Sequence, residues 1–127
     1  MQNINIIIPK EILKKSIIEN DNIKNTEFEI FINNYKYSMD KSIFSNFRRI
    51  SNIILKIYNY SCKIDSINKI LNYLINKYNN WYTENIKKEI TENTNIKTLK
   101  KIKYIEELYN MYYSIRNKDY KINIKIS

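Results

Sequence analysis

Isoleucine recurs at every second position near both ends of the chain, in residues 4–8 and in residues 120–126. Because the side chains of a strand point alternately to its two faces, each run predicts a strand with one face on a core. An unpaired strand of this kind would tend to aggregate, so both runs need partners. We expect them to join the domain's own sheet, to pair with each other, or to pair with a second copy or a bound protein.

A further alternation occupies residues 28–39. The runs 28–32 and 35–39 each alternate, and Asn33 and Asn34 lie between them. Asparagine tolerates the positive φ that a two-residue hairpin turn requires, and the chain has no glycine to use instead. The pattern therefore predicts a β-hairpin whose turn is Asn33-Asn34.

Helical spacing dominates the remaining segments. Residues 10–19 predict a short amphipathic helix, and the polar residues 20–26 predict a loop. Asp40 is a natural N-cap for a helix over residues 43–50, followed by a second helix or a continuation from residue 51 to Tyr58. Residues 62–64 predict a short strand.

Asp65 or Ser66 then begins the most regular helix of the chain, and a short helix with Ile86 and Ile90 follows it. The last long helix is predicted over residues 98–116. The apolar stripe of the first of these helices consists of Ile67, Ile70, Leu71, Leu74, Ile75 and Tyr78. The inward positions of the last helix are Leu99, Ile102, Ile105, Leu108, Tyr109 and Tyr112.

This order of elements resembles the BTB/POZ family, in particular its small adaptors of cullin-type ubiquitin ligases. Residues 28–47, FEIFINNYKYSMDKSIFSNF, look like the family's opening hairpin and first helix. Residues 62–78, CKIDSINKILNYLINKY, are similar to its third strand and following helix. Residues 108–122, LYNMYYSIRNKDYKI, resemble its last segment, where Leu108, Asp119 and Lys121 coincide with the family's residues. The resemblance covers about residues 28–124.

The resemblance implies an α+β, BTB/POZ-like fold, with a small sheet and an opening hairpin packed against a cluster of helices. Residues 1–26 would form an N-terminal strand and short helix extension of a single globular domain, and residues 27–127 its BTB/POZ-like part. The implied function is adaptor work: binding a protein partner, such as a cullin or a host protein, or self-association. The family's small-residue and Asn-Tyr positions in the last segment are Ser114-Ile115 and Arg116-Asn117 here, which puts cullin binding in doubt.

Composition narrows the chemistry further. With no histidine and no glycine, the chain cannot form a Ser-His-Asp or Cys-His site, a P-loop or a dinucleotide fingerprint. The close carboxylate pairs, Glu27 with Glu29 and Glu106 with Glu107, are interpreted as solvent-facing. We therefore predict a non-enzymatic protein with no catalytic, cofactor-binding or metal-binding residues. A lone cysteine, no signal peptide and no long apolar segment predict an intracellular protein, cytoplasmic or nuclear, without a membrane span.

The net charge of +9 supports an alternative, a basic and mostly helical nucleic-acid-binding protein. Against it, the basic residues are scattered, in pairs such as Arg48-Arg49 and Lys100-Lys101. The abundant Ile, Asn, Lys and Tyr all have A/T-rich codons, so an AT-rich genome, for example viral or parasitic, would supply lysines without selection for binding. A structural protein that only oligomerises is a third alternative. The candidate partner-binding residues are Trp81, Tyr82, Tyr113, Arg116, Ile122, Ile124 and Ile126.

Overall fold

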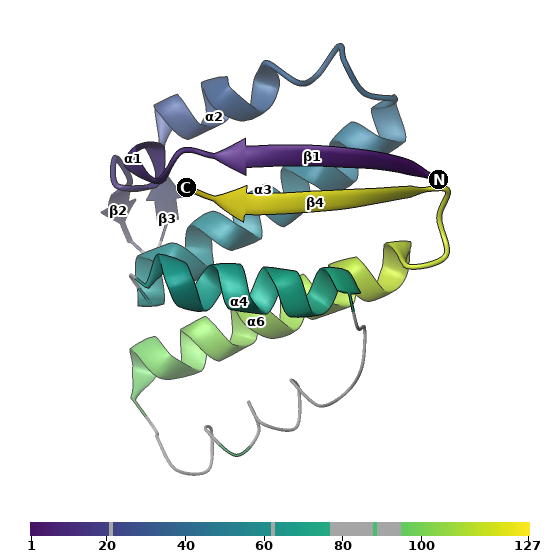
Figure 1. Cartoon of the computed structure of the whole chain (residues 1–127). Helices are drawn as coiled ribbons and strands as arrows, with labels where there is room; N and C mark the ends of the chain where they lie inside the picture. The colour runs from purple at the N-terminus through teal and green to yellow at the C-terminus, as the bar shows by residue number, and fades with distance from the viewer. Residues whose placement is uncertain (21, 62, 77–87, 89–94) are drawn as a thin grey trace.

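The two ends of the chain meet in one parallel pair of strands, and helices cover one face of it (Figure 1). This arrangement is seen in a computed structural model that describes residues 1–20, 22–61, 63–76, 88 and 95–127. Its elements follow in the order β1 (Gln2–Ile8), α1 (Lys10–Leu13), β2 (Ile17–Glu19), β3 (Asn22–Lys24), α2 (Thr26–Asn33), α3 (Lys41–Ser61), α4 (Ile64–Asn76), α6 (Ile96–Ile115) and β4 (Tyr120–Ile126).

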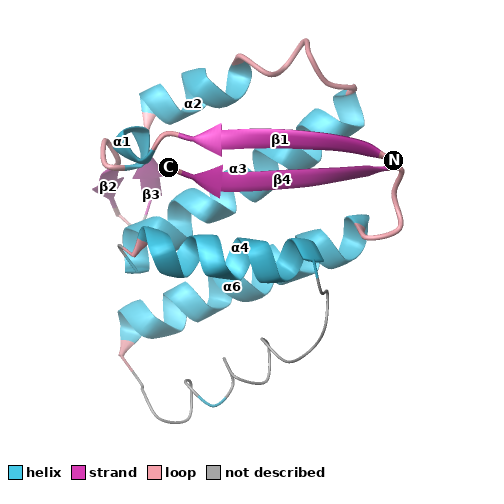
Figure 2. Ribbon diagram, viewed as in Figure 1, coloured by secondary structure: helices cyan, strands magenta, loops and turns pink. Residues whose placement is uncertain are grey.

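Strands β1 and β4 lie side by side and run in the same direction (Figure 2), with Gln2 opposite Tyr120 and Ile8 opposite Ile126. The alternating isoleucines of both strands are buried, and the residues between them face outward or lie half-exposed. Both terminal strands are thus confirmed, and they pair with each other within one chain. We call this pair the β1–β4 ribbon.

Helix α4 seals the edge of β4 that faces away from β1. The Asn68 side chain donates to the Ile126 carbonyl at 2.8 Å and accepts from the Ile126 N–H at 2.8 Å. The Tyr112 hydroxyl of α6 donates to the Ile122 carbonyl at 3.4 Å. Side chains therefore take the place that a third strand would occupy beside β4.

The long helices form where their apolar spacing predicts. Residues 41–61 are one continuous helix, so the segment after residue 51 is a continuation and not a second helix. The stripe of α4 is buried as predicted from Ile67 to Ile75, and Tyr78 lies outside the described residues. Helix α6 buries Ile102, Ile105, Leu108 and Tyr112, but the prediction for Leu99 is wrong, since it is 39% exposed in the first turn.

The predicted hairpin at Asn33-Asn34 is wrong, because residues 26–33 form helix α2. Its buried residues are Phe28 and Ile32, four positions apart, whereas Ile30 between them is 58% exposed. That is helical spacing, which a short run of alternating apolar residues imitates. The second run, residues 35–39, forms turns in place of a strand.

The segment before α2 also differs from its prediction. The helix predicted for residues 10–19 ends at Leu13. Residues 17–19 and 22–24 pair as the antiparallel strands β2 and β3, where the end of that helix and a loop were predicted. Asn20, in the turn, has φ 49°, which asparagine tolerates. Residue 64 begins α4 and is not in a strand; Cys62 and the predicted helix with Ile86 and Ile90 fall outside the described residues.

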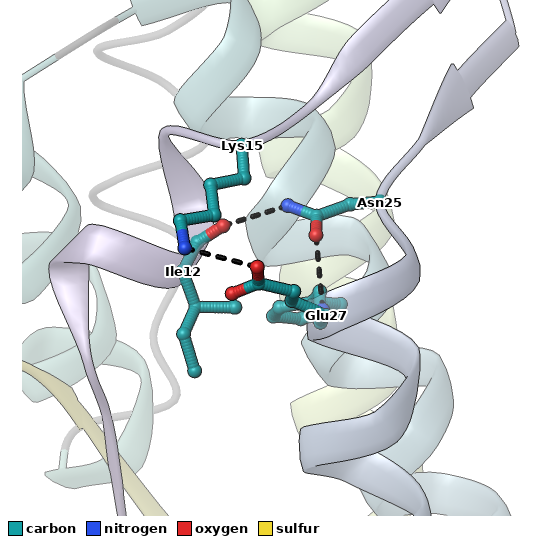
Figure 3. A network of polar contacts seen from close by, with 5 residues as sticks. Ile12, Lys15, Asn25 and Glu27 are labelled. Carbon is teal, nitrogen blue, oxygen red and sulfur yellow. Dashed lines mark hydrogen bonds and ion pairs between the residues drawn. The ribbon is translucent and has the colours of Figure 1, made fainter.

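Asn25 joins α1 to α2 (Figure 3). It is the N-cap of α2, where its Oδ1 accepts from the Phe28 N–H at 2.9 Å, and its Nδ2 donates to the Ile12 carbonyl at 2.7 Å. Lys15 and Glu27 form an ion pair of 2.9 Å across the same junction. Asn25 is 4% exposed, and its Nδ2 also donates to the Ser16 Oγ at 3.1 Å, so these three bonds replace contacts with water that the fold removes.

The α+β class and the small sheets are confirmed by these elements. The opening hairpin is not, so the first of the three stretches that resemble the BTB/POZ family has a different structure here. The segment 1–26 contributes β1 to the ribbon and Leu13 to the core.

Candidate functional site

The structure separates the predicted partner-binding residues into three groups. Ile122, Ile124 and Ile126 lie on the inner face of the ribbon with at most 4% exposure, so their side chains are part of the core and unavailable to a partner. Tyr113 is 45% exposed on α6, and the Arg116 guanidinium lies 3.5 Å from its ring centroid. These two remain a candidate surface, and the other two, Trp81 and Tyr82, fall outside the described residues.

The carboxylate pairs that could have served acid–base chemistry lie apart. Glu27 and Glu29 are exposed in the first turn of α2, where Glu27 is paired with Lys15. Glu106 and Glu107 are half-exposed on α6. Among the described residues, acidic and cysteine side chains nowhere gather in a group of three that could hold a metal ion.

A hollow of about 590 Å³ runs between α3 and α6. Each helix contributes residues three, four and seven positions apart, which places them on one face of that helix. They lie on the side of α3 away from its fully buried positions Phe47, Ile50, Ile54 and Ile57. The lining consists of Arg49, Asn52, Ile53 and Lys56 from α3 and Glu107, Asn110, Met111 and Ser114 from α6.

A cluster of tyrosines and lysines adjoins this hollow. The rings of Tyr60 and Tyr104 stack at 5.7 Å between centroids. The ammonium group of Lys56 lies 5.3 Å from the Tyr104 ring and that of Lys103 5.7 Å from it, while Lys100 lies 5.5 Å from the Tyr60 ring. Cations over ring faces at this distance are attracted by the ring's negative face. We call the hollow and this cluster together the α3–α6 groove.

The charges of the α3–α6 groove do not cancel. Arg49, Lys56 and Lys103 carry three positive charges, and the lining includes one carboxylate, Glu107. Within the described ranges, no carboxylate forms an ion pair with Arg49, Lys56 or Lys103. The groove is therefore a positively charged surface with half-buried Met111 and buried Ile53 beneath it.

A second hollow, of about 680 Å³, lies where the outer face of the ribbon meets α4. Its polar lining combines two lysines with asparagines, and the Asn123 amide donates to Asn5 Oδ1 at 3.0 Å across the two strands. The polar side chains of this hollow are Asn5, Asn68, Lys69, Asn72, Asn123 and Lys125.

Sequence reasoning missed the α3–α6 groove because Tyr60 and Tyr104 meet only in the folded chain. One local signal was present. Residues 96–105 contain Lys97, Lys100, Lys101 and Lys103 and no acidic residue, so one helical segment is locally basic.

In the part of the chain that the structure describes, no helix is long and apolar enough to cross a membrane. The predicted BTB/POZ membership stays a prediction. No family model, curated protein or solved structure matches this chain.

Proposed function

We propose that this chain is a non-enzymatic protein-interaction domain that binds an acidic segment of a partner protein in the α3–α6 groove. The observation that supports the proposal is the imbalance of charge in this groove, where Arg49, Lys56 and Lys103 outnumber the one lining carboxylate. Such a surface attracts an acidic segment and accelerates its association, more so in a protein of net charge +9.

The apolar floor of the groove favours a protein segment over a nucleic acid. Half-buried Met111 offers a contact to apolar side chains, and methionine adapts its shape to different partners. The rings of Tyr60 and Tyr104 stack on each other with lysines over their faces, whereas a nucleic-acid binder would offer such rings to bases. Glu107 would repel a phosphate but can pair with a basic residue of a partner.

The expected affinity is modest. Each exposed ion pair contributes about 0.2–1 kcal/mol, so three pairs supply about 1–3 kcal/mol. The remaining free energy comes from apolar area, at roughly 25 cal/mol per Å² removed from water. We therefore expect a dissociation constant in the micromolar range, near −8 kcal/mol. The narrower role implied by the resemblance, linking a partner to a cullin-type ubiquitin ligase or self-association, stays a prediction.

The test uses a short fluorescein-labelled peptide in which glutamate pairs alternate with leucine pairs, read by fluorescence anisotropy at about 0.15 M salt. Removing two groove charges in Lys56→Gln/Lys103→Gln should weaken binding roughly two- to thirtyfold, since about 0.4–2 kcal/mol of ion pairing is lost. The matched control Lys36→Gln/Lys41→Gln removes the same charge from exposed positions outside the groove and should change affinity less than about twofold.

A labelled oligo-dT of similar charge distinguishes the alternative function. We expect weak retention that disappears as salt rises, because counterions return to the phosphates. Tighter binding of oligo-dT than of the peptide near physiological salt, lost in Lys56→Gln/Lys103→Gln, would replace the proposal with nucleic-acid binding. Equal losses in the groove variant and the control would show that net charge, and not the groove, attracts the peptide.

A further inference from the structure

We infer that the outer edge of β1 is a second docking site, at which an extended acidic segment of a partner protein adds as a strand to the ribbon. The inference rests on the proposed function as a protein-interaction domain and adds a surface separate from the α3–α6 groove. Its basis is the difference between the two edges of the ribbon.

The hydrogen bonds at both ends of the ribbon show which backbone groups of β1 remain available. Gln2 N–H donates to the Asp119 carbonyl, and Ser127 pairs with the Ile8 carbonyl and the Lys10 N–H. In a parallel ladder the bonding residues of one strand alternate. The even-numbered residues of β1 therefore face β4, and the N–H and C=O groups of Asn3, Asn5 and Ile7 point to the other edge.

No backbone group elsewhere in the described ranges bonds to this edge of β1. The opposite edge of the ribbon is closed, since Asn68 and Tyr112 bond to the backbone of β4. Helix α2 lies on this side of β1 in Figure 1, and the side chains of Asn3, Asn5 and Ile7 are exposed. Among the described residues, the backbone groups of this edge of β1 thus have no backbone partner.

Strand β1 also lacks the devices that normally protect a sheet edge. Its sequence, QNINIII, contains no charged residue and no proline, and its register with β4 is free of bulges. Ile7 is 61% exposed on the outer face. Natural proteins cover or charge such an edge unless another strand pairs with it, and strand addition uses these backbone groups for affinity and neighbouring side chains for specificity.

Charge selects an acidic occupant. Neither β1 nor β4 contains an acidic residue, and the outer face of β4 carries Lys121 and Lys125. A strand added to β1 would lie about 10 Å from β4, a distance that lysine and glutamate side chains span together. Glu11, which follows β1, is paired with Lys14, and Asp119 immediately precedes β4.

A peptide fits this edge better than a second copy does. Seven residues extend about 24 Å, and one such edge buries several hundred Å² at most, below the roughly 1,200 Å² of a stable protein–protein interface. Two copies would also each carry a net charge of +9. A short extended segment with carboxylates at alternate positions does not need so large an interface, and its charge is opposite to that of the protein.

The experiment follows amide hydrogen exchange by NMR with a peptide in which glutamate alternates with valine as the probe. In the free protein, the amides of Asn3, Asn5 and Ile7 should exchange fast and those of Ile4, Ile6 and Ile8 slowly. Saturating peptide should slow the first three by about tenfold or more. The same peptide with lysine in place of glutamate should have no effect.

Two variants separate backbone from side-chain recognition. Asn5→Pro removes the outward N–H, keeps the bonds to β4 and should weaken the peptide about tenfold. Asn5→Ala keeps the N–H and should bind within about threefold of the unmodified protein. If Asn5→Pro does not fold, Asn3→Pro provides the same test. Lys121→Gln/Lys125→Gln should weaken binding more than the control Lys36→Gln/Lys41→Gln.

If acidic peptides bind and slow no amide of β1, strand addition is wrong and the α3–α6 groove alone carries the proposed function. If no acidic peptide binds anywhere, both proposals fail. If the amides of Asn3, Asn5 and Ile7 exchange slowly without peptide and the protein sediments as a dimer, the occupant is a second copy and the peptide proposal is overturned.

Discussion

Replacing Asn25 with alanine tests whether one buried amide joins α1 to α2. The substitution removes three hydrogen bonds together, one of them from the Asn25 Nδ2 to the Ser16 Oγ at 3.1 Å. The Phe28 N–H loses its N-cap acceptor at 2.9 Å, and the Ile12 carbonyl loses the donor at 2.7 Å. Both partners are close to a side chain that is 4% exposed, so water replaces these bonds poorly.

The magnitude follows from these losses. Removing an asparagine N-cap costs about 1 kcal/mol, and losing the bonds from Nδ2 to the Ile12 carbonyl and to Ser16 costs about 0.5–1.5 kcal/mol each. The Ile12 carbonyl still accepts from the Lys15 N–H at 3.2 Å. The free energy of unfolding should therefore fall by about 2–4 kcal/mol. For a chain of 127 residues this corresponds to a melting temperature lower by roughly 8–16 °C.

The assay is urea unfolding followed by far-UV circular dichroism. Asn25→Ser separates the two contributions, because serine caps a helix well but is too short to reach the Ile12 carbonyl. It should lose about 1–3 kcal/mol, less than Asn25→Ala loses. A loss below about 1 kcal/mol for Asn25→Ala, or a larger loss for serine than for alanine, would refute the reasoning.

Three further predictions concern the core, the ribbon and the charge. Leu71→Ala and Leu74→Ala should each lower the free energy of unfolding by about 2–5 kcal/mol, since both leucines are almost fully buried; equilibrium urea unfolding measures this, and a loss below about 1 kcal/mol at both would mean that the site collapses around the smaller side chain. Deleting residues 121–127 should abolish cooperative melting, because β1 would lose its partner; a truncated chain that melts like the full one would show the ribbon to be dispensable. Retention on heparin or DNA columns should fall steeply with salt, with no sequence preference in competition assays; nanomolar, sequence-selective binding near physiological salt would contradict this.

The sequence predicted those elements in which the apolar spacing repeats over enough residues to be unambiguous. Helix α4 and strand β4 appear where their spacing indicated. Residues 28–32 were ambiguous, because Phe28 and Ile32 fit both a strand face and one helical face. The deciding signal was upstream: Asn25 as N-cap, with Glu27 and Glu29 in the first turn, is typical of a helix start.

Other features depend on contacts between distant residues. The pairing of the two terminal strands was one of several open possibilities, and nothing in either run selects a parallel register. The stack of Tyr60 on Tyr104, which joins α3 to α6, likewise depends on two residues that are far apart in the sequence. The burial of Ile122, Ile124 and Ile126 follows once β4 is placed against the helices, so these residues stabilise the core and leave binding to surfaces elsewhere.

The pairing of the first strand with the last has a consequence for the order in which the chain folds. Asn5 and Asn123 are 118 positions apart, so β1 leaves the ribosome long before its partner exists. At about 5–20 residues per second, it waits roughly 6–24 seconds without a neighbour. Contacts of such long range also slow the search for the native state, because the loop must close before they form. During this interval the neutral strand QNINIII lacks a partner strand and is a site at which nascent chains can aggregate.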